Sequence, residues 1–309
     1  MASLKSWAKA ARLRTLPLAV TCVILGAAIA QQHNLQSESL EITLWQKLTF
    51  LFALITVIRL QVLANYANDY GDFEKGTDEG RNDRALASGD ITPMEMKRML
   101  KFSIVKAFVA GCLTLALAFM DAKVDWTMLA LGGLGVLGIV AALKYTMGSG
   151  AFGYKGLGDL FVMVFFGYVG VLGVGYLLVH TIEWNWLLPA TFSGLMAVAV
   201  LNLNNMRDVE SDELSGKNTM VVKMGYKKAK YYHAFLIITA WACLLPYLYG
   251  SWKGFTWFVL IALTQTVHLV FVYRSTDPKT LDPELKKVAM GAFVTALFML
   301  MSVAVIIQA

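Results

Sequence analysis

Charged residues are scarce in this sequence. Only 16% of its 309 residues are Asp, Glu, Lys or Arg, whereas about a quarter is usual in a soluble globular domain. Hydrophobic side chains make up 57%, and the mean hydropathy is +0.58. This composition excludes an ordinary soluble domain and predicts a protein embedded in a bilayer.

Cysteine and histidine are also rare. The three cysteines lie singly in apolar runs and form no CxxC pair, so neither a disulfide framework nor a thiolate metal site is expected. The four histidines form no HExxH pair and no spacing typical of haem ligands, which argues against a zinc protease or a b-type cytochrome.

Long apolar runs are abundant, and a transmembrane helix needs about 20 apolar residues. The first run follows a basic segment and ends in Ala28-Ile29-Ala30, so it also resembles a secretory signal peptide. We predict an all-α integral membrane protein with one domain over residues 1–309. The nine expected transmembrane helices cover residues 14–32, 46–66, 101–120, 126–144, 157–179, 186–206, 232–250, 254–274 and 287–308.

Lys and Arg are distributed very unevenly between the two sides of these spans. The side opposite the N-terminus has only Lys47, Lys123 and Lys253. The positive-inside rule therefore places the N-terminus in the cytoplasm and the C-terminus outside. The formal charge of +6 is explained by orientation, and no nucleic-acid partner is expected.

Two long polar segments, residues 67–100 and 207–231, interrupt an otherwise compact chain on the predicted cytoplasmic side. If the preceding helices continue into them, each presents polar residues at positions i, i+3 and i+7 on one face. The two sets are Asn65, Asn68 and Asp72, and Asn205, Asp208 and Asp212. Because the two helices must run in the same direction, we expect two pseudo-repeated helical bundles around a central cavity, with both Asp-rich loops at its cytoplasmic mouth.

Carboxylate and amide oxygens of this kind suit Mg²⁺, which is usually held by one or two carboxylates together with substrate phosphates. The predicted metal ligands are Asn68, Asp72, Asp208 and Asp212, and the predicted diphosphate ligands are Arg84, Arg207, Lys217 and Lys223. Asn65 and Asn205 are expected to line the substrate pocket. Arg59, deeper in the second span, is expected either to bind substrate or to pair internally.

The same loops also allow a purely structural role or a different function. Asp and Asn near helix ends often cap helices or turn the chain, and charged runs are usually solvated. A cation transporter would also place Asp and Asn at broken helices, although normally near the middle of the membrane.

The two segments Asn68-Asp69-x-x-Asp72 and Asn205-x-x-Asp208-x-x-x-Asp212 resemble the signatures of the intramembrane aromatic prenyltransferase (UbiA-type) family. The stretch from Asn204-Asn205-Met206-Arg207-Asp208 to Gly216-Lys217-Asn218-Thr219 is most similar to members that act on 1,4-dihydroxy-2-naphthoate. The resemblance implies Mg²⁺-dependent transfer of a polyprenyl group from polyprenyl diphosphate to that acceptor, with loss of CO2 and diphosphate, in menaquinone biosynthesis. A 4-hydroxybenzoate acceptor is the nearest alternative.

The resemblance further implies a bacterial cytoplasmic membrane, contact with membrane lipid, and catalytic roles for Asp72, Asp208, Asp212 and Arg84. The chain departs from the family pattern in two places. Gly76 stands where relatives usually have a further Asp, and Asp78 is the possible substitute. The loop of residues 147–152 lacks the prolines of relatives, although Tyr145, Tyr154 and Lys155 around it are expected to contact the aromatic acceptor.

Overall fold

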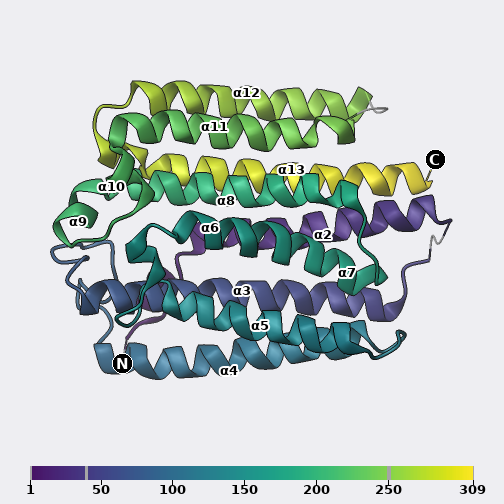
Figure 1. The fold of residues 1–309 in the computed structure, drawn as a ribbon, viewed down its shortest axis with the longest axis horizontal. Helices are drawn as coiled ribbons and strands as arrows, with labels where there is room; N and C mark the ends of the chain where they lie inside the picture. Colours follow the sequence, from purple (N-terminus) through teal and green to yellow (C-terminus); the bar gives the residue numbers. More distant parts are fainter. Residues whose placement is uncertain (1, 39–40, 249–251, 309) are drawn as a thin grey trace.

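The computed structural model describes residues 2–38, 41–248 and 252–308. In this part of the chain the regular structure is entirely helical, and the long helices lie side by side in one bundle (Figure 1). Each of the nine predicted spans coincides with a helix; residues 249–250, at the end of one prediction, lie outside the described residues. The long helices are α2 (Leu16–Gln36), α3 (Leu44–Glu74), α4 (Pro93–Ala118), α5 (Trp126–Lys144), α8 (Leu187–Arg207), α11 (Tyr226–Leu244), α12 (Trp252–Arg274) and α13 (Asp282–Gln308).

The fifth predicted span is built from three consecutive pieces. These are α6 (Gly158–Val162), the π-helical segment η3 (Met163–Leu172) and α7 (Gly173–Val179). A π-helix of this length is unusual, and π-helical turns often occur at functional sites. Short elements complete the chain: α1 (Leu4–Ala11), η1 (Leu13–Thr15), η2 (Phe152–Lys155), η4 (Trp184–Trp186), α9 (Val209–Leu214), α10 (Met220–Met224), η5 (Leu245–Leu248) and η6 (Pro278–Leu281).

Among the described residues, seven helical segments are long and apolar enough to cross a membrane. The helices α11 and α12 are the two predicted spans outside this group. Many large apolar side chains are exposed on the outside of the bundle, including Phe102 and Val105 of α4 and Leu129 and Leu137 of α5. Such a surface is unfavourable in water and suits contact with lipid.

Local sequence signals explain where the helices near the site begin and end. Thr43 and Thr92 start α3 and α4 with capping boxes, in which the Thr side chain and the N3 side chain satisfy each other's backbone amides. The helix α3 continues well beyond its apolar part and ends just before Gly76, whose φ of +72° suits glycine. The polar segment after residue 66 is therefore helical up to Glu74.

One end of the bundle carries α1, α9, α10 and the loop between α3 and α4, and we call it the loop end (Figure 1). Both α3 and α8 run toward this end, as the predicted repeat requires, and the C-terminus lies at the other end. The helices α2 and α8 are the most buried spans, while α11 and α12 pack on the outside against α8 and α13. The arrangement brings both Asp-rich segments to one mouth of the bundle.

Candidate functional site

A cavity of about 690 Å³ enters the bundle at the loop end. Its wall comes mainly from α2, α3, α4, α5, η3 and α8, whereas α11 and α12 contribute none of its described lining residues. These two helices pack on the outer face, against α8 and α13. All charged lining residues lie at the loop end, namely Arg12, Arg14, Asp72, Asp78, Arg81, Arg84, Asp208, Asp212 and Lys217.

Helix α3 places Asn65, Asn68 and Asp72 along the cavity, on the shared face expected from their spacing. Just beyond them, α3 passes very close to the chain after α5. A Cβ on Gly71 would lie 2.8 Å from the Thr146 carbonyl carbon, and Thr146 Oγ1 donates to the Ala67 carbonyl oxygen at 2.9 Å. Glycine at this position therefore lets the loop after α5 close against the polar end of α3.

Asp72 is buried, and its carboxylate contacts both a hydroxyl group and an ammonium group. Its Oδ1 accepts a hydrogen bond from the Tyr154 hydroxyl at 2.8 Å, and Thr77 Oγ1 lies 2.6 Å from that hydroxyl on the other side. The ammonium of Lys217 lies 3.4 Å from Asp72 and 3.7 Å from Asp212. Lys217 thus joins the carboxylates of the two Asp-rich segments, which are far apart in sequence.

The second segment is not one continuous helix. Asp208 is the residue between α8 and α9, and its N–H donates a hydrogen bond to the Asn204 carbonyl at 3.1 Å, as in a continuing helix. Asn205, Asp208 and Asp212 all line the cavity. The predicted common face is therefore formed, although a break in the helix lies in its middle.

Three arginines surround Asp208. Arg207 binds it with two hydrogen bonds of 2.8 and 2.7 Å, Arg81 Nη1 lies 2.9 Å away, and Arg84 Nη2 lies 3.8 Å away. Burial alone would raise the pKa of Asp208, but the hydrogen bonds and charge of Arg207 together with the charges of Arg81 and Arg84 hold it well below its usual range. Asp208 is consequently ionised at neutral pH.

Asp212 differs from Asp208 although both face the cavity. Burial, opposed by Lys217 and reinforced by the nearby carboxylates of Asp208 and Asp72, raises the pKa of Asp212 to about 7. Burial is the largest cause of this rise, and the two nearby carboxylates add to it. A cation bound beside Asp212 would stabilise its charged form.

Asp78 and Arg84 form a second buried pair beside this group. Their closest atoms, Arg84 Nε and Asp78 Oδ1, lie 3.5 Å apart, and Asp78 Oδ2 has no hydrogen-bond partner. Burial raises the pKa of Asp78 and, joined by the charge of Arg12, lowers that of Arg84 to about 10. Asp78 thus brings a further carboxylate to the mouth, two residues after the position where Gly76 departs from the family pattern.

Two arginines of the mouth were assigned by sequence only to membrane orientation. Arg81 links Asp78 and Asp208, and Arg12 lines the cavity in a left-handed conformation with φ of 48°. For Arg81, the sequence did contain a signal, since it lies close to Arg84 in the same loop. For Arg12, only the fold brings the residue between α1 and η1 to the cavity.

Four predicted contacts lie outside the cavity lining. Lys155 is exposed, and Lys223 is turned to its backbone carbonyl at 2.7 Å, so the geometry gives neither residue a place at the cavity. Arg207 is held by Asn204, Asp208 and Asp282, and Tyr154 contacts the cavity-lining residues Asp72 and Thr77 through its hydroxyl. These last two side chains are placed to position Asp208 and Asp72.

Arg59 is exposed on α3 and does not line the cavity, and no ion pair joins it to another described residue. Neither role considered for it fits this position. We expect Arg59→Ala to change kcat/KM by no more than about twofold, because surface substitutions away from special contacts usually cost less than about 0.5 kcal/mol. Steady-state kinetics would check this, and a loss of tenfold or more would contradict it.

The oxygen donors at the mouth suit a metal ion that is also held by its substrate. Within the described ranges, no three His, Cys, Asp or Glu side chains form a cluster able to hold a metal alone. The mouth does offer hard oxygen donors, including Asp78 Oδ2, which has no hydrogen-bond partner among the described residues, and the buried carboxylate of Asp212. This donor set suits Mg²⁺ bound by one or two carboxylates and completed by phosphate oxygens.

Residues 18–301 match the model of the UbiA prenyltransferase family. The chain is 40% identical to the 1,4-dihydroxy-2-naphthoate octaprenyltransferase of Haemophilus influenzae, over 93% of this chain and 92% of that protein. It is 39% identical to the enzyme of the same name from Escherichia coli, over 97% and 95% of the two chains.

Solved structures share the fold at low sequence identity. A UbiA homologue from Aeropyrum pernix superposes with a TM-score of 0.66 at 14% identity, over 96% of this chain and 99% of that one. A UbiA homologue from Archaeoglobus fulgidus, bound to GPP and Mg²⁺, has a TM-score of 0.55 at 13% identity, over 98% and 100% of the chains.

Proposed function

This chain belongs to the UbiA prenyltransferase family, and from that premise we propose that it prenylates 1,4-dihydroxy-2-naphthoate in menaquinone biosynthesis. The donor is a polyprenyl diphosphate, and the other products are CO2 and diphosphate. Its long apolar helices and its family make it an integral membrane protein.

The observation that carries the proposal is the composition of the cavity mouth. Asp72 and Asp78 from the first Asp-rich segment and Asp208 and Asp212 from the second, here called the carboxylate cluster, lie at the mouth of the cavity. The described residues of its deeper wall carry no charge. A polyprenyl diphosphate has the matching shape, with a highly charged head and a long apolar tail. The cluster supports binding of the head through a cation, and the deeper cavity supports binding of the tail.

We assign Asn68, Asp72, Asp208 and Asp212 to hold Mg²⁺, with Asp78 as an additional carboxylate. Bound there, Mg²⁺ would supply Lewis-acid stabilisation of the departing diphosphate. Arg81, Arg84 and Lys217 would neutralise the remaining charge of the diphosphate oxygens. Asp208 fixes two of these arginines, which orients their guanidinium groups before the donor binds.

The reaction itself breaks the bond between prenyl C1 and the diphosphate oxygen, and the bonding electrons leave with diphosphate. A ring carbon of the naphthoate then bonds to C1. Cleavage of the bond from that carbon to its carboxylate releases CO2 and returns the electron pair to the ring, so no C–H proton has to be removed. The charge-free cavity below the mouth limits capture of the allylic cation by water.

We further propose that all nine long helices cross the bilayer, with the N-terminus and the loop end in the cytoplasm and the C-terminus outside. The excess of Lys and Arg at the loop end supports this orientation. Both water-soluble participants, the acceptor and the released diphosphate, would then meet the enzyme in the cytoplasm.

The first experiment is an assay of the purified protein in detergent with Mg²⁺ and a polyprenyl diphosphate. Dihydroxynaphthoate and 4-hydroxybenzoate would be offered separately, with an EDTA control, and both diphosphate and CO2 would be measured. We expect metal-dependent product and CO2 from the naphthoate only. Product from the benzoate only would move the acceptor to that of ubiquinone biosynthesis, and no product from either would overturn the proposal.

A further inference from the structure

The polar face of α3 continues one turn deeper than the Asp-rich segment. Gln61 lies four residues before Asn65, so Gln61, Asn65, Asn68 and Asp72 form one stripe at positions i, i+4, i+7 and i+11. All four line the cavity. Below Gln61 the α3 positions in the cavity are mainly apolar, with Leu60, Val57 and Ala53, so Gln61 marks the boundary between polar and apolar walls.

A short hydrogen-bond chain determines which end of the Gln61 amide faces the cavity. The backbone carbonyl of Ala11 can only accept, and it receives Asn65 Nδ2 at 2.8 Å. Asn65 Oδ1 must therefore face Gln61, whose Nε2 donates to it at 3.2 Å. The Gln61 nitrogen also faces Thr15 Oγ1 at 3.4 Å.

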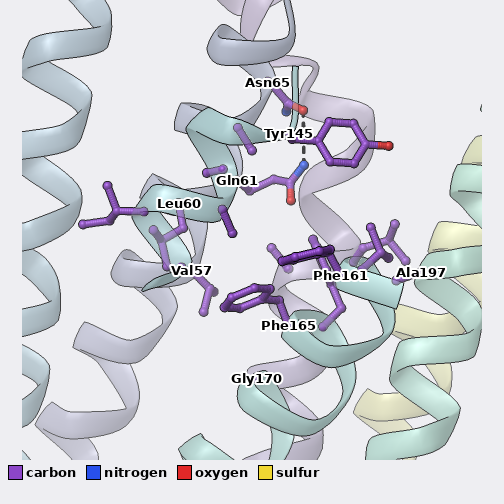
Figure 2. A pocket seen from close by; sticks show the side chains of 18 of the residues that line it. Val57, Leu60, Gln61, Asn65, Tyr145, Phe161, Phe165, Gly170 and Ala197 are labelled. Atoms are coloured by element: carbon purple, nitrogen blue, oxygen red, sulfur yellow. Dashed lines mark hydrogen bonds between the residues drawn. The ribbon is translucent and has the colours of Figure 1, made fainter. Parts of the chain in front are cut away.

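This leaves the carbonyl oxygen of Gln61 as the free end of the chain. No donor in the described part of the protein bonds to it, and Figure 2 shows it pointing away from Asn65, toward the level of Phe161. Gln61 is half-buried and lines the cavity. The oxygen is thus an acceptor held by its own amide nitrogen and directed into the pocket.

Aromatic rings also line the cavity, with Phe161 and Phe165 on the side of Gln61 away from Asn65 (Figure 2). Phe152 and Phe161 are stacked with ring centroids 3.8 Å apart, and Phe161 and Phe165 are nearly parallel, 16° apart, with centroids separated by 6.5 Å. Tyr145 packs edge-on against Phe152. Phe165 belongs to η3, so the π-helical segment carries part of this wall.

The level of Gln61 suits the reacting end of the donor. At 1.5 Å per residue, Asn65 lies about 10 Å and Gln61 about 16 Å along α3 from Asp72. A diphosphate held at the carboxylate cluster occupies the first part of this distance, and the prenyl C1 follows it into the cavity. The ring that attacks C1 must therefore bind near Asn65, Gln61 and the aromatic wall.

We propose that Gln61 and Phe161 form the binding site for the ring of the acceptor, a specificity that rests on the proposed function. The Gln61 carbonyl oxygen accepts a hydrogen bond from a ring hydroxyl, and Phe161, continued by Phe165, stacks on the ring face. A fused bicyclic dihydroxyarene uses both features, because it offers a hydroxyl at its edge and enough area for two parallel rings. The hydrogen bond also shifts electron density toward the ring carbon that attacks.

The test combines Gln61→Met, which keeps the length of the side chain and removes its whole amide, with a naphthoate in which one ring hydroxyl is a methyl ether. The methyl ether isolates the role of the amide oxygen, because the amide nitrogen bonds to Asn65 and Thr15 rather than to the acceptor. Against wild type, we expect Gln61→Met to raise the KM for dihydroxynaphthoate about tenfold, the usual worth of one buried neutral hydrogen bond. The KM for polyprenyl diphosphate should stay within about twofold. For wild type, one of the two monomethyl ethers should bind about tenfold more weakly than dihydroxynaphthoate. For Gln61→Met, the same ether and dihydroxynaphthoate should bind equally well, because the hydrogen bond is already lost.

Two further variants separate ring binding from other effects. Phe161→Leu should weaken the binding of dihydroxynaphthoate, measured by KM, more than that of a monocyclic hydroxybenzoate, measured as a competitive inhibitor. Gln46→Met is the matched control, because it makes the same substitution on α3 at a glutamine that does not line the cavity and whose Nε2 donates to the Leu178 carbonyl at 2.8 Å. It should leave both KM values unchanged.

The outcomes distinguish this inference from the function on which it rests. Wild-type protein that makes no naphthoate product overturns the proposed function and the ring site with it. Active wild type with an unchanged acceptor KM in both Gln61→Met and Phe161→Leu overturns the ring site alone. A fall in kcat without a change in acceptor KM would assign Phe161 to stabilising the allylic cation and would also overturn it.

Discussion

Asp72→Asn is expected to lower kcat/KM by about a thousandfold, or about 4 kcal/mol of transition-state stabilisation. Asp72 is the carboxylate that the first Asp-rich segment directs to the cavity, and we assign it to Mg²⁺. Asparagine keeps an oxygen for the Tyr154 hydroxyl, so local packing should survive while the negative charge is lost. Initial rates measured over a range of Mg²⁺ concentrations would show a higher metal requirement as well as a lower rate.

The matched control is Asp83→Asn in the following loop. Asp83 also accepts hydrogen bonds from Arg81, at 3.0 and 2.8 Å, but it is half exposed at 53% and does not line the cavity. The kcat/KM of Asp83→Asn should fall by no more than a few-fold. If Asp72→Asn retained more than a tenth of wild-type activity, or if both variants lost activity equally, Asp72 would not be a metal ligand.

Lys217→Met is expected to destabilise the protein strongly when Mg²⁺ is absent. Although burial opposes its charge, Asp72 and Asp212 raise the pKa of Lys217 above its usual range, so it is a buried cation between two buried carboxylates. Removing one partner of such a group typically costs about 3 kcal/mol or more, because charges remain unpaired. The apparent Tm in EDTA should therefore fall by several degrees.

Mg²⁺ should restore part of the lost stability of Lys217→Met, since a metal ion at the carboxylate cluster replaces the missing charge. Activity should still fall by about a hundredfold, because one cation facing the diphosphate is gone. Lys223→Met is the control, since Lys223 bonds only to the Lys155 carbonyl outside the cavity, and it should change neither property. Equal Tm values with and without Mg²⁺ would contradict a metal site between Asp72 and Asp212.

The helices were predictable because their signals are local. Each of the nine apolar runs coincides with a helix, and the continuation of α3 to Glu74 followed from the spacing of Asn65, Asn68 and Asp72. The break at Asp208 was not predicted, since no Gly or Pro marks it. That nine rather than seven of these helices cross the membrane stays a prediction.

The site was predictable only in part. The two Asp-rich segments were paired correctly, since parallel helices with the same polar face must end at one side of the bundle. The sequence did not predict which charged side chains contact one another. Arg81 binds Asp208, whereas Lys223 and Arg59 point away from the cavity. Long basic side chains reach several partners, and spacing along the chain does not choose among them.

The sequence by itself therefore determined the helical membrane architecture, the family, and the two segments that carry the carboxylates, because hydrophobic length, charge asymmetry and helical spacing are properties of short stretches of chain. Only the tertiary structure decided which cation faces which carboxylate, that Arg12 reaches the cavity, and that the Gln61 oxygen is free to accept. These features depend on contacts between residues tens to hundreds of positions apart, and packing of the folded bundle alone selects them.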